Sequence, residues 1–195
     1  MISPPAKAGP DWLRTFVCIK IPEGHLKIIS AWINARRIES KEIRWIGPSN
    51  IHITLKFCGE RHWDSVEKLA CNLEKIKHNG PFSIYIEGLG GFPDLLRPRI
   101  VWAGIKGDIR GLRCLQRDVE NAASDAGIPK EERPYSPHIT LGRRASALPL
   151  PDGIKKAVES DVISLEPWTV SEIILMRSEL GRSGARYTEL GLFKI

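Results

Sequence analysis

The spacing of apolar residues along the chain predicts a mixed α+β fold. Short runs rich in β-branched and aromatic side chains are typical of strands. They occupy residues 14–21, 43–46, 50–58, 82–89, 99–105 and 138–142, with two later runs around 169–176 and 184–193. Two stretches in the first half, residues 25–38 and 63–77, instead carry apolar residues at helical spacing. A third helix is predicted after Asp108, whose carboxylate can cap it.

The remaining segments are expected to be loops or a leader. Residues 90–94 and the Pro- and Gly-rich residues 148–153 are predicted loops. Residues 1–11 contain several prolines but no apolar run, so we expect a flexible leader and no signal peptide. A single domain of two lobes is then expected over residues 12–195.

One short motif occurs in both halves of the chain. The order strand, helix, strand is repeated, and the last strand of each repeat carries His-Ile-Thr-Leu, at residues 52–55 and 138–141. The halves diverge too far elsewhere for a repeat to be identified by its period alone. A duplicated α+β lobe is the simplest interpretation.

The motif places an imidazole and a hydroxyl on the same face of a strand. Side chains alternate along a strand, so His52 and Thr54 point one way while the apolar residues between them point to the core. His138 and Thr140 do the same in the second copy. If the two faces meet across a cleft, one histidine can accept a proton and the other donate one. Hydroxyls can stabilise the charge that develops on phosphate oxygens, so this pattern predicts phosphoryl chemistry without a metal or cofactor.

Composition and charge narrow the possible partners. The 195 residues are 42% apolar and 27% charged, which excludes a disordered or collagen-like chain. A net charge of +6 favours a phosphate-bearing partner such as nucleic acid. Lys56 and Arg143 follow the two histidine motifs, and we expect both on the cleft side.

A zinc site is the main alternative for the two histidines, but it needs a third ligand at matching spacing, and threonine is a poor one. No two of the four cysteines form a CxxC pair, which excludes a zinc ribbon and indicates a reducing compartment. No apolar stretch is long enough to span a bilayer. We therefore expect a cytoplasmic protein with no membrane contact.

The chain resembles the two-histidine phosphoesterases, and within them the RNA 2',3'-cyclic phosphodiesterases, also called 2'-5' RNA ligases. Besides the histidine motifs, the resemblance extends over nearly the whole chain after the leader. It is carried by residues 16–22 (FVCIKIP), 44–45 (RW), 50–60 (NIHITLKFCGE), 82–93 (FSIYIEGLGGFP), 98–104 (PRIVWAG), 133–143 (RPYSPHITLGR) and 178–188 (SELGRSGARYT).

This resemblance implies two pseudo-symmetric lobes, with antiparallel sheets around a central cleft and helices on the outside. It also implies that His52 donates a proton to the departing 3' oxygen and that His138 activates water. Thr54, Thr140 and Arg143 would hold the phosphate oxygens. Phe16 matches an aromatic residue of the first strand that could stack on a terminal base, although a core position fits it equally well.

The implied activity is hydrolysis of a terminal 2',3'-cyclic phosphate to a 2'-phosphomonoester, on RNA 3' ends or on cyclic nucleotides. The same groups acting in reverse would join a cyclic phosphate to a 5'-hydroxyl as a 2'-5' RNA ligase. A non-catalytic RNA or nucleotide binder is the third possibility. No obligatory protein partner is evident, and His25, His62 and His78 lack the motif and receive no role.

Overall fold

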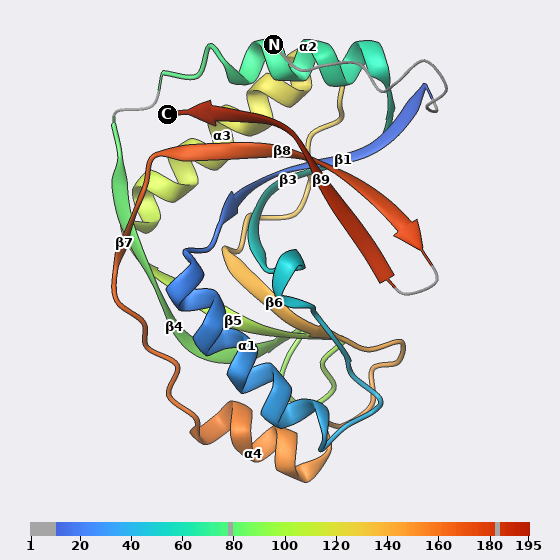
Figure 1. Cartoon of the computed structure of the whole chain (residues 1–195), viewed down its shortest axis with the longest axis vertical. Helices are drawn as coiled ribbons and strands as arrows, with labels where there is room; N and C mark the ends of the chain where they lie inside the picture. Colours follow the sequence, from blue (N-terminus) through green and yellow to red (C-terminus); the bar gives the residue numbers. More distant parts are fainter. Residues whose placement is uncertain (1–10, 78–79, 182–183) are drawn as a thin grey trace.

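The computed structural model describes residues 11–77, 80–181 and 184–195 (Figure 1). The predicted leader, except for its last residue, and His78 lie outside the described residues. The strands are β1 (Trp12–Lys20), β2 (Arg44–Trp45), β3 (His52–His62), β4 (Phe82–Phe92), β5 (Ile100–Gly107), β6 (His138–Arg143), β7 (Trp168–Val170), β8 (Glu172–Gly181) and β9 (Gly184–Lys194). The helices are α1 (Glu23–Arg37), α2 (Trp63–Leu73), α3 (Ile109–Asp125) and α4 (Asp152–Ser160), with a 3-10 turn at Pro48–Asn50.

The strands form one curled antiparallel sheet with internal symmetry. In the described part of the chain it has nine strands in the order β7-β4-β5-β6-β3-β1-β8-β9, and β2 pairs with β6. The two motif strands, β6 and β3, lie at the centre of the sheet. The neighbour of β3 on its outer side is β1, which precedes α1, and the neighbour of β6 on its outer side is β5, which precedes α3. The α+β fold with two related lobes is confirmed, but the lobes share a continuous sheet through the pair Ile53 and Ile139.

The helices cover the sheet face that carries the apolar residues of the motifs. Figure 1 shows α2 and α3 beside the β1, β3 and β8 half, and α1 and α4 beside the β4 to β6 half. Ile53 and Ile139 are fully buried in the same core as the α3 residues Leu112 and Leu115. The polar residues of both motifs therefore lie on the opposite face, which we call the site face. Among the described helices, none is long and apolar enough to cross a membrane.

The sequence predictions fail at three boundaries. Helix α4 begins at Asp152, inside the predicted loop over residues 148–153, and its buried stripe includes Ile154 and Val158. The predicted strand over residues 169–176 is two strands, because β7 pairs with β4 and β8 pairs with β1. Strand β4 also continues through the predicted loop at Gly90, where a β-carbon would lie 2.2 Å from the Trp102 ring.

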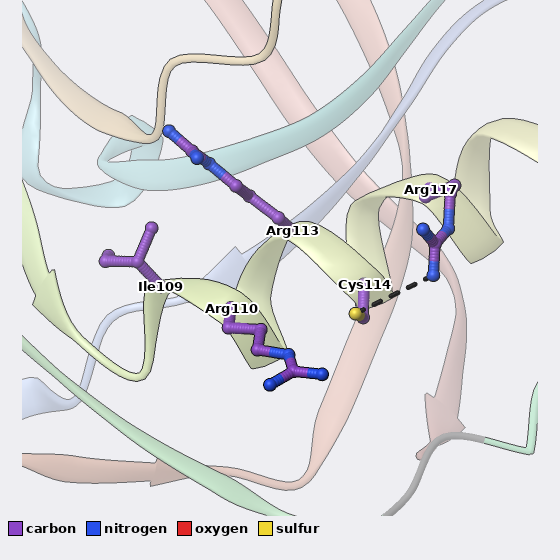
Figure 2. A pocket seen from close by; sticks show the side chains of 5 residues that line it. All are labelled: Ile109, Arg110, Arg113, Cys114 and Arg117. Atoms are coloured by element: carbon purple, nitrogen blue, oxygen red, sulfur yellow. Dashed lines mark hydrogen bonds between the residues drawn. The ribbon is translucent and has the colours of Figure 1, made fainter.

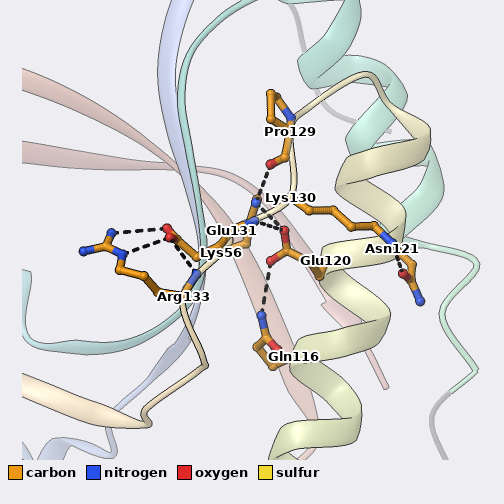
Figure 3. A network of polar contacts seen from close by, with 8 residues as sticks. All are labelled: Lys56, Gln116, Glu120, Asn121, Pro129, Lys130, Glu131 and Arg133. Carbon is orange, nitrogen blue, oxygen red and sulfur yellow. Dashed lines mark hydrogen bonds and ion pairs between the residues drawn. The ribbon is translucent and has the colours of Figure 1, made fainter.

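Lys56 does not lie on the site face, contrary to the prediction. In the register of β3 with β1, Cys18 opposes Thr54 and Val17 opposes Lys56, so Leu55 is an extra residue that resets the alternation. Lys56 is 4% exposed. Its ammonium group pairs with Glu120 of α3 and donates to the Pro129 carbonyl at 2.7 Å (Figure 3). This charge belongs to the core and is not available to RNA.

Candidate active site

The two histidines begin the two central strands, and the strand pairing brings their motifs together. Ile53 on β3 opposes Ile139 on β6, and each isoleucine stands between the histidine and threonine of its motif. His52, Thr54, His138 and Thr140 are all partly exposed, whereas the isoleucines have no exposed surface. The structure therefore places all four polar side chains of the motifs on the site face.

The two imidazoles are held in the same way. His52 Nδ1 donates a hydrogen bond to the Asn50 carbonyl at 2.8 Å, and His138 Nδ1 donates to the Ser136 carbonyl at 2.8 Å. Because a carbonyl only accepts, each Nδ1 carries its proton. Each Nε2 is then the ring nitrogen that can exchange a proton with a substrate. The two Nε2 atoms can therefore share acid–base chemistry when one imidazole is protonated and the other is neutral.

The threonines differ in their contacts with the imidazoles. Thr54 Oγ1 lies 3.1 Å from His52 Nε2 and donates its proton to the neutral imidazole. Within the described residues, the equivalent hydrogen bond between Thr140 and His138 is not formed. The Thr140 hydroxyl is therefore not engaged with its own histidine and is the more available of the two to a ligand.

Burial and positive charge lower the pKa values of both histidines. Burial lowers the pKa of His52 to about 4, helped by the charges of Arg143 and His138 and opposed by the hydrogen bond to the Asn50 carbonyl. Burial also lowers the pKa of His138, again helped by Arg143 and opposed by the hydrogen bond to the Ser136 carbonyl. Arg143 therefore lies close enough to act on both rings. Both imidazoles are neutral in the free protein at neutral pH.

Arg143 reaches the site face because β6 also contains an extra residue. Trp102 opposes Thr140 and Val101 opposes Gly142, so the alternation is reset after Leu141. Arg143 is exposed and forms no hydrogen bond or ion pair with any described residue. Arg144, in contrast, is buried and pairs with Glu42 at 3.0 Å. A guanidinium without an acidic partner, placed near two imidazoles, suits a phosphate group.

Aromatic rings support both histidines. Phe16 stacks on His52 with 4.8 Å between ring centroids, and Tyr187 contacts both of these rings edge-on. Phe92 lies edge-on to His138 at 4.9 Å. Phe16 is 3% exposed, which is at odds with the expectation that a terminal base stacks on it. Its position instead fixes the His52 ring.

Tyr187 and Phe92 were not predicted as site residues. Both lie in segments that carry the family resemblance, residues 178–188 and 82–93. A strand pattern alone does not tell which aromatic residue of a distant strand reaches the histidines, because that depends on the strand order of the sheet.

The other features with catalytic or binding potential lie outside this site. His25 contacts the Glu166 carbonyl at 2.7 Å, and His62 accepts a hydrogen bond from the Asp64 amide at the start of α2. No cluster of three possible metal ligands occurs among the described residues. A surface pocket of about 550 Å³ on α3 is basic, and Figure 2 shows that it contains no motif residue. Its lining is Ile109, Arg110, Arg113, Cys114 and Arg117.

The lowered histidine pKa values predict a loss of stability in acid. The pKa of His52 is about 4 in the folded protein, and unfolding returns it to the ordinary value near 6.5. The unfolded state therefore binds more protons between these values, and the free energy of unfolding decreases as the pH falls through this window. From pH 7 to pH 5 we expect His52 to account for at most about 2 kcal/mol of this decrease.

Urea unfolding of the wild type and of His52→Asn at both pH values measures this contribution. The wild type should lose more stability than the variant, because asparagine does not titrate. Equal losses in the two proteins would show that His52 keeps an ordinary pKa in the folded state.

Comparison with known proteins agrees with this geometry. Residues 28–182 match the family described as the 2'-5' RNA ligase superfamily. The RNA 2',3'-cyclic phosphodiesterase of Aeropyrum pernix is 34% identical over 148 residues, which cover 76% of this chain and 84% of that protein. The protein of the same name from Thermus thermophilus is 31% identical over 191 residues, covering 94% of this chain and 90% of that protein.

Solved structures give the same result at the level of the fold. The apo form of E. coli LigT superposes with a TM-score of 0.77 and 28% identity, covering 95% of this chain and 99% of that one. The crystal structure of TT0787 from Thermus thermophilus has a TM-score of 0.76 and 27% identity, covering 93% and 97% of the two chains. Because the sequence match spans most of the chain and the fold agrees along nearly its full length, the chain belongs to the 2'-5' RNA ligase superfamily.

Proposed function

We propose that this chain hydrolyses the terminal 2',3'-cyclic phosphate of RNA to a 2'-phosphomonoester, by acid–base catalysis that needs no metal. One observation carries the proposal. Two imidazoles with the same protonated Nδ1 lie on one sheet face, and the charge of Arg143 acts on both. Binding alone needs phosphate donors but not two proton-transfer groups, so this arrangement favours catalysis over a binding module. The curated relatives described above carry the same activity in their names.

In the proposed reaction, His138 Nε2 takes a proton from water as the water oxygen attacks phosphorus. The bond between phosphorus and the 3' oxygen breaks, and His52 Nε2 gives its proton to that oxygen. Arg143 and the hydroxyls of Thr54 and Thr140 bind the non-bridging oxygens, where negative charge increases in the transition state. The products are a 2'-phosphomonoester and a free 3'-hydroxyl, and proton exchange with solvent restores both histidines.

The donor role requires His52 to be protonated, whereas its pKa is about 4 in the free protein. Burial is the largest cause of that low pKa, and the charge of Arg143 adds to it. A bound phosphodiester is negatively charged, so it offsets the charge of Arg143 and favours the protonated imidazole. Substrate binding therefore raises the pKa of His52, so that its imidazole is protonated when the substrate is bound. Arg143 both binds the phosphate and makes the protonation of His52 depend on it.

The decisive experiment is turnover of a 2',3'-cyclic nucleotide by the purified protein, with the product identified by phosphorus NMR. We expect the 2'-phosphate, formed at the same rate with and without EDTA. Binding without turnover would overturn the proposal in favour of a binding module, and loss of activity in EDTA that zinc restores would overturn the metal-free mechanism.

Ligation is a second candidate, favoured by the description of the matching family. It uses the same groups in the same roles, with a 5'-hydroxyl in place of water: His138 takes the proton of that hydroxyl, its oxygen bonds to phosphorus, and His52 protonates the departing 3' oxygen. Incubation of RNA halves that end in a 2',3'-cyclic phosphate and a 5'-hydroxyl distinguishes the two, because only ligation yields a longer strand with a 2'-5' bond.

The four cysteines are free thiols, which fits the cytoplasmic location inferred from the sequence.

A further inference from the structure

The fifth residue after each histidine occupies an equivalent place in the two lobes. The extra residues Leu55 in β3 and Leu141 in β6 reset the alternation at the same point of each motif. As a result, Arg143 in one lobe and Phe57 in the other are exposed, whereas the residues just before them are buried. Phe57 therefore stands where the symmetry of the fold places the phosphate-binding arginine of the opposite lobe.

Phe57 is an unusual residue for this surface. It is 49% exposed, and it opposes Phe16 in the pairing of β3 with β1. Directly opposed residues of two paired strands share a face, so Phe57 lies on the same face as Phe16. Phe16 in turn stacks on His52, so the three rings follow one another across this face. A large exposed apolar ring loses contact with water when a flat ligand covers it.

Arg14 adds a positive charge to this ring. Its guanidinium carbon lies 4.6 Å from the centroid of Phe57, within the range of a cation–π contact. Arg14 is exposed and has no acidic partner in the described part of the chain. Arg14 stands two residues before Phe16 in β1, and Phe16 stacks on His52, so the alternation of the strand places Arg14 on the same side of the sheet as the histidines.

The distance along β3 indicates which part of a substrate could reach this platform. Phe57 lies five positions after His52, and at about 3.3 Å per residue, less the bulge, their α-carbons are about 13–16 Å apart. This is too far for the base on the ribose that carries the cyclic phosphate. It suits the nucleotide that precedes it in the strand.

We propose that Phe57 and Arg14 form a subsite for the penultimate nucleotide of an RNA 3' end, in which the base stacks on the platform and Arg14 binds the adjoining phosphodiester. This inference rests on the proposed function and names its substrate class: an RNA end of at least two nucleotides rather than a cyclic mononucleotide. Aromatic side chains and arginine planes are the surfaces on which single-stranded RNA bases stack.

The test compares a dinucleotide that ends in a 2',3'-cyclic phosphate with the matching cyclic mononucleotide. For the wild type, kcat/KM should be about 5- to 100-fold higher for the dinucleotide. In Phe57→Ala this ratio should fall several-fold, because only the Arg14 contact with the phosphodiester is left, while Phe57→Tyr, which keeps the ring, should retain it. Phe57 is exposed, so the thermal midpoint of the alanine variant should match that of the wild type. A wild-type ratio near one, or a ratio unchanged in Phe57→Ala, overturns the subsite.

Arg14 provides an independent measurement through salt. Arg14→Gln should weaken dinucleotide binding and flatten the plot of log affinity against log salt concentration by about 0.7. Arg113→Gln removes the same charge from α3, outside the site, and should leave the slope unchanged (Figure 2). Equal slopes in wild type and Arg14→Gln contradict the phosphate contact.

Failure of the subsite and failure of the proposed function remain distinguishable. Affinities for a dinucleotide and a mononucleotide that each end in a 2'-phosphate are measured by calorimetry, which requires no turnover. Absence of turnover on both cyclic substrates rejects the function, whereas equal affinity for the two 2'-phosphates rejects the subsite.

Discussion

Alanine at His52 or His138 is expected to slow hydrolysis of a 2',3'-cyclic phosphate by about 10²–10⁴-fold, the usual contribution of a general acid or base. The effect should fall mainly on kcat, because each imidazole moves a proton in the transition state. Initial rates over a range of substrate concentrations measure it. His25→Ala is the matched control, since His25 hydrogen-bonds the Glu166 carbonyl away from the site and should leave the rate unchanged.

The two roles can be separated with a substrate whose leaving group needs no proton, such as a nitrophenyl phosphodiester. If His52 is the proton donor, the defect of His52→Ala shrinks on this substrate, while that of His138→Ala remains. The reverse result would exchange the two roles. A variant that keeps more than a tenth of wild-type activity on the cyclic substrate would contradict acid–base catalysis by that histidine.

Removing the carboxylate of Glu120 is expected to destabilise the fold by about 3–5 kcal/mol. The ammonium group of Lys56 is buried and pairs with this carboxylate, which also accepts hydrogen bonds from the side chain of Gln116 and the backbone amide of Glu131 (Figure 3). Glu120→Ala leaves the Lys56 charge in the core with only the Pro129 carbonyl to bind. Urea unfolding at pH 7 measures the change.

A double variant and a control at an exposed ion pair test the cause of this destabilisation. Lys56→Met combined with Glu120→Leu removes both charges, and it should recover most of the loss because no unpaired ion stays buried. Glu23→Ala breaks the exposed pair of Glu23 with Lys27 and should change stability by less than about 1 kcal/mol. If Glu120→Ala costs no more than Glu23→Ala, the Lys56–Glu120 pair does not hold α3 to the sheet.

Much of the site could be predicted because the repeated motif encodes both a strand and its two faces. Ile53 and Ile139 are apolar and therefore had to face the core, where both are buried. This condition alone placed His52 and His138 on the opposite face of the sheet. The positions after the motif could not be placed in this way. Strict alternation puts Lys56 beside His52 and turns Arg143 away from His138, and the structure reverses both.

The reason is the extra residue in each strand, at Leu55 and at Leu141. Nothing in the local composition marks these bulges, because leucine is as common in a regular strand as in a bulged one. Only the family resemblance assigns Arg143 to the phosphate. Phe57 and Arg14 were missed because no pattern within one strand shows which residue of a neighbouring strand they face.

The long-range parts of the fold could not be predicted for a related reason. The residue types around Ser171 are typical of one continuous strand, yet the segment crosses from β4 in one lobe to β1 in the other. The position of that crossing depends on the order of strands in the whole sheet. The α4 stripe, with Ile154 and Val158 at helical spacing, was present in the sequence and was obscured by the preceding Pro-rich loop.

The narrow contact between β3 and β6 has a consequence for how such a site can evolve. In the described structure these strands meet at the single pair Ile53 and Ile139, while β1 and β3 pair along their full length. The angle between the lobes therefore sets the gap between the two imidazoles, and each histidine stays fixed to its own backbone carbonyl. Substitutions in the lobe cores can retune that gap for a larger or smaller phosphate ester without altering either imidazole. A fold built from two such lobes can thus change its substrate through core residues that lie far from the two histidines.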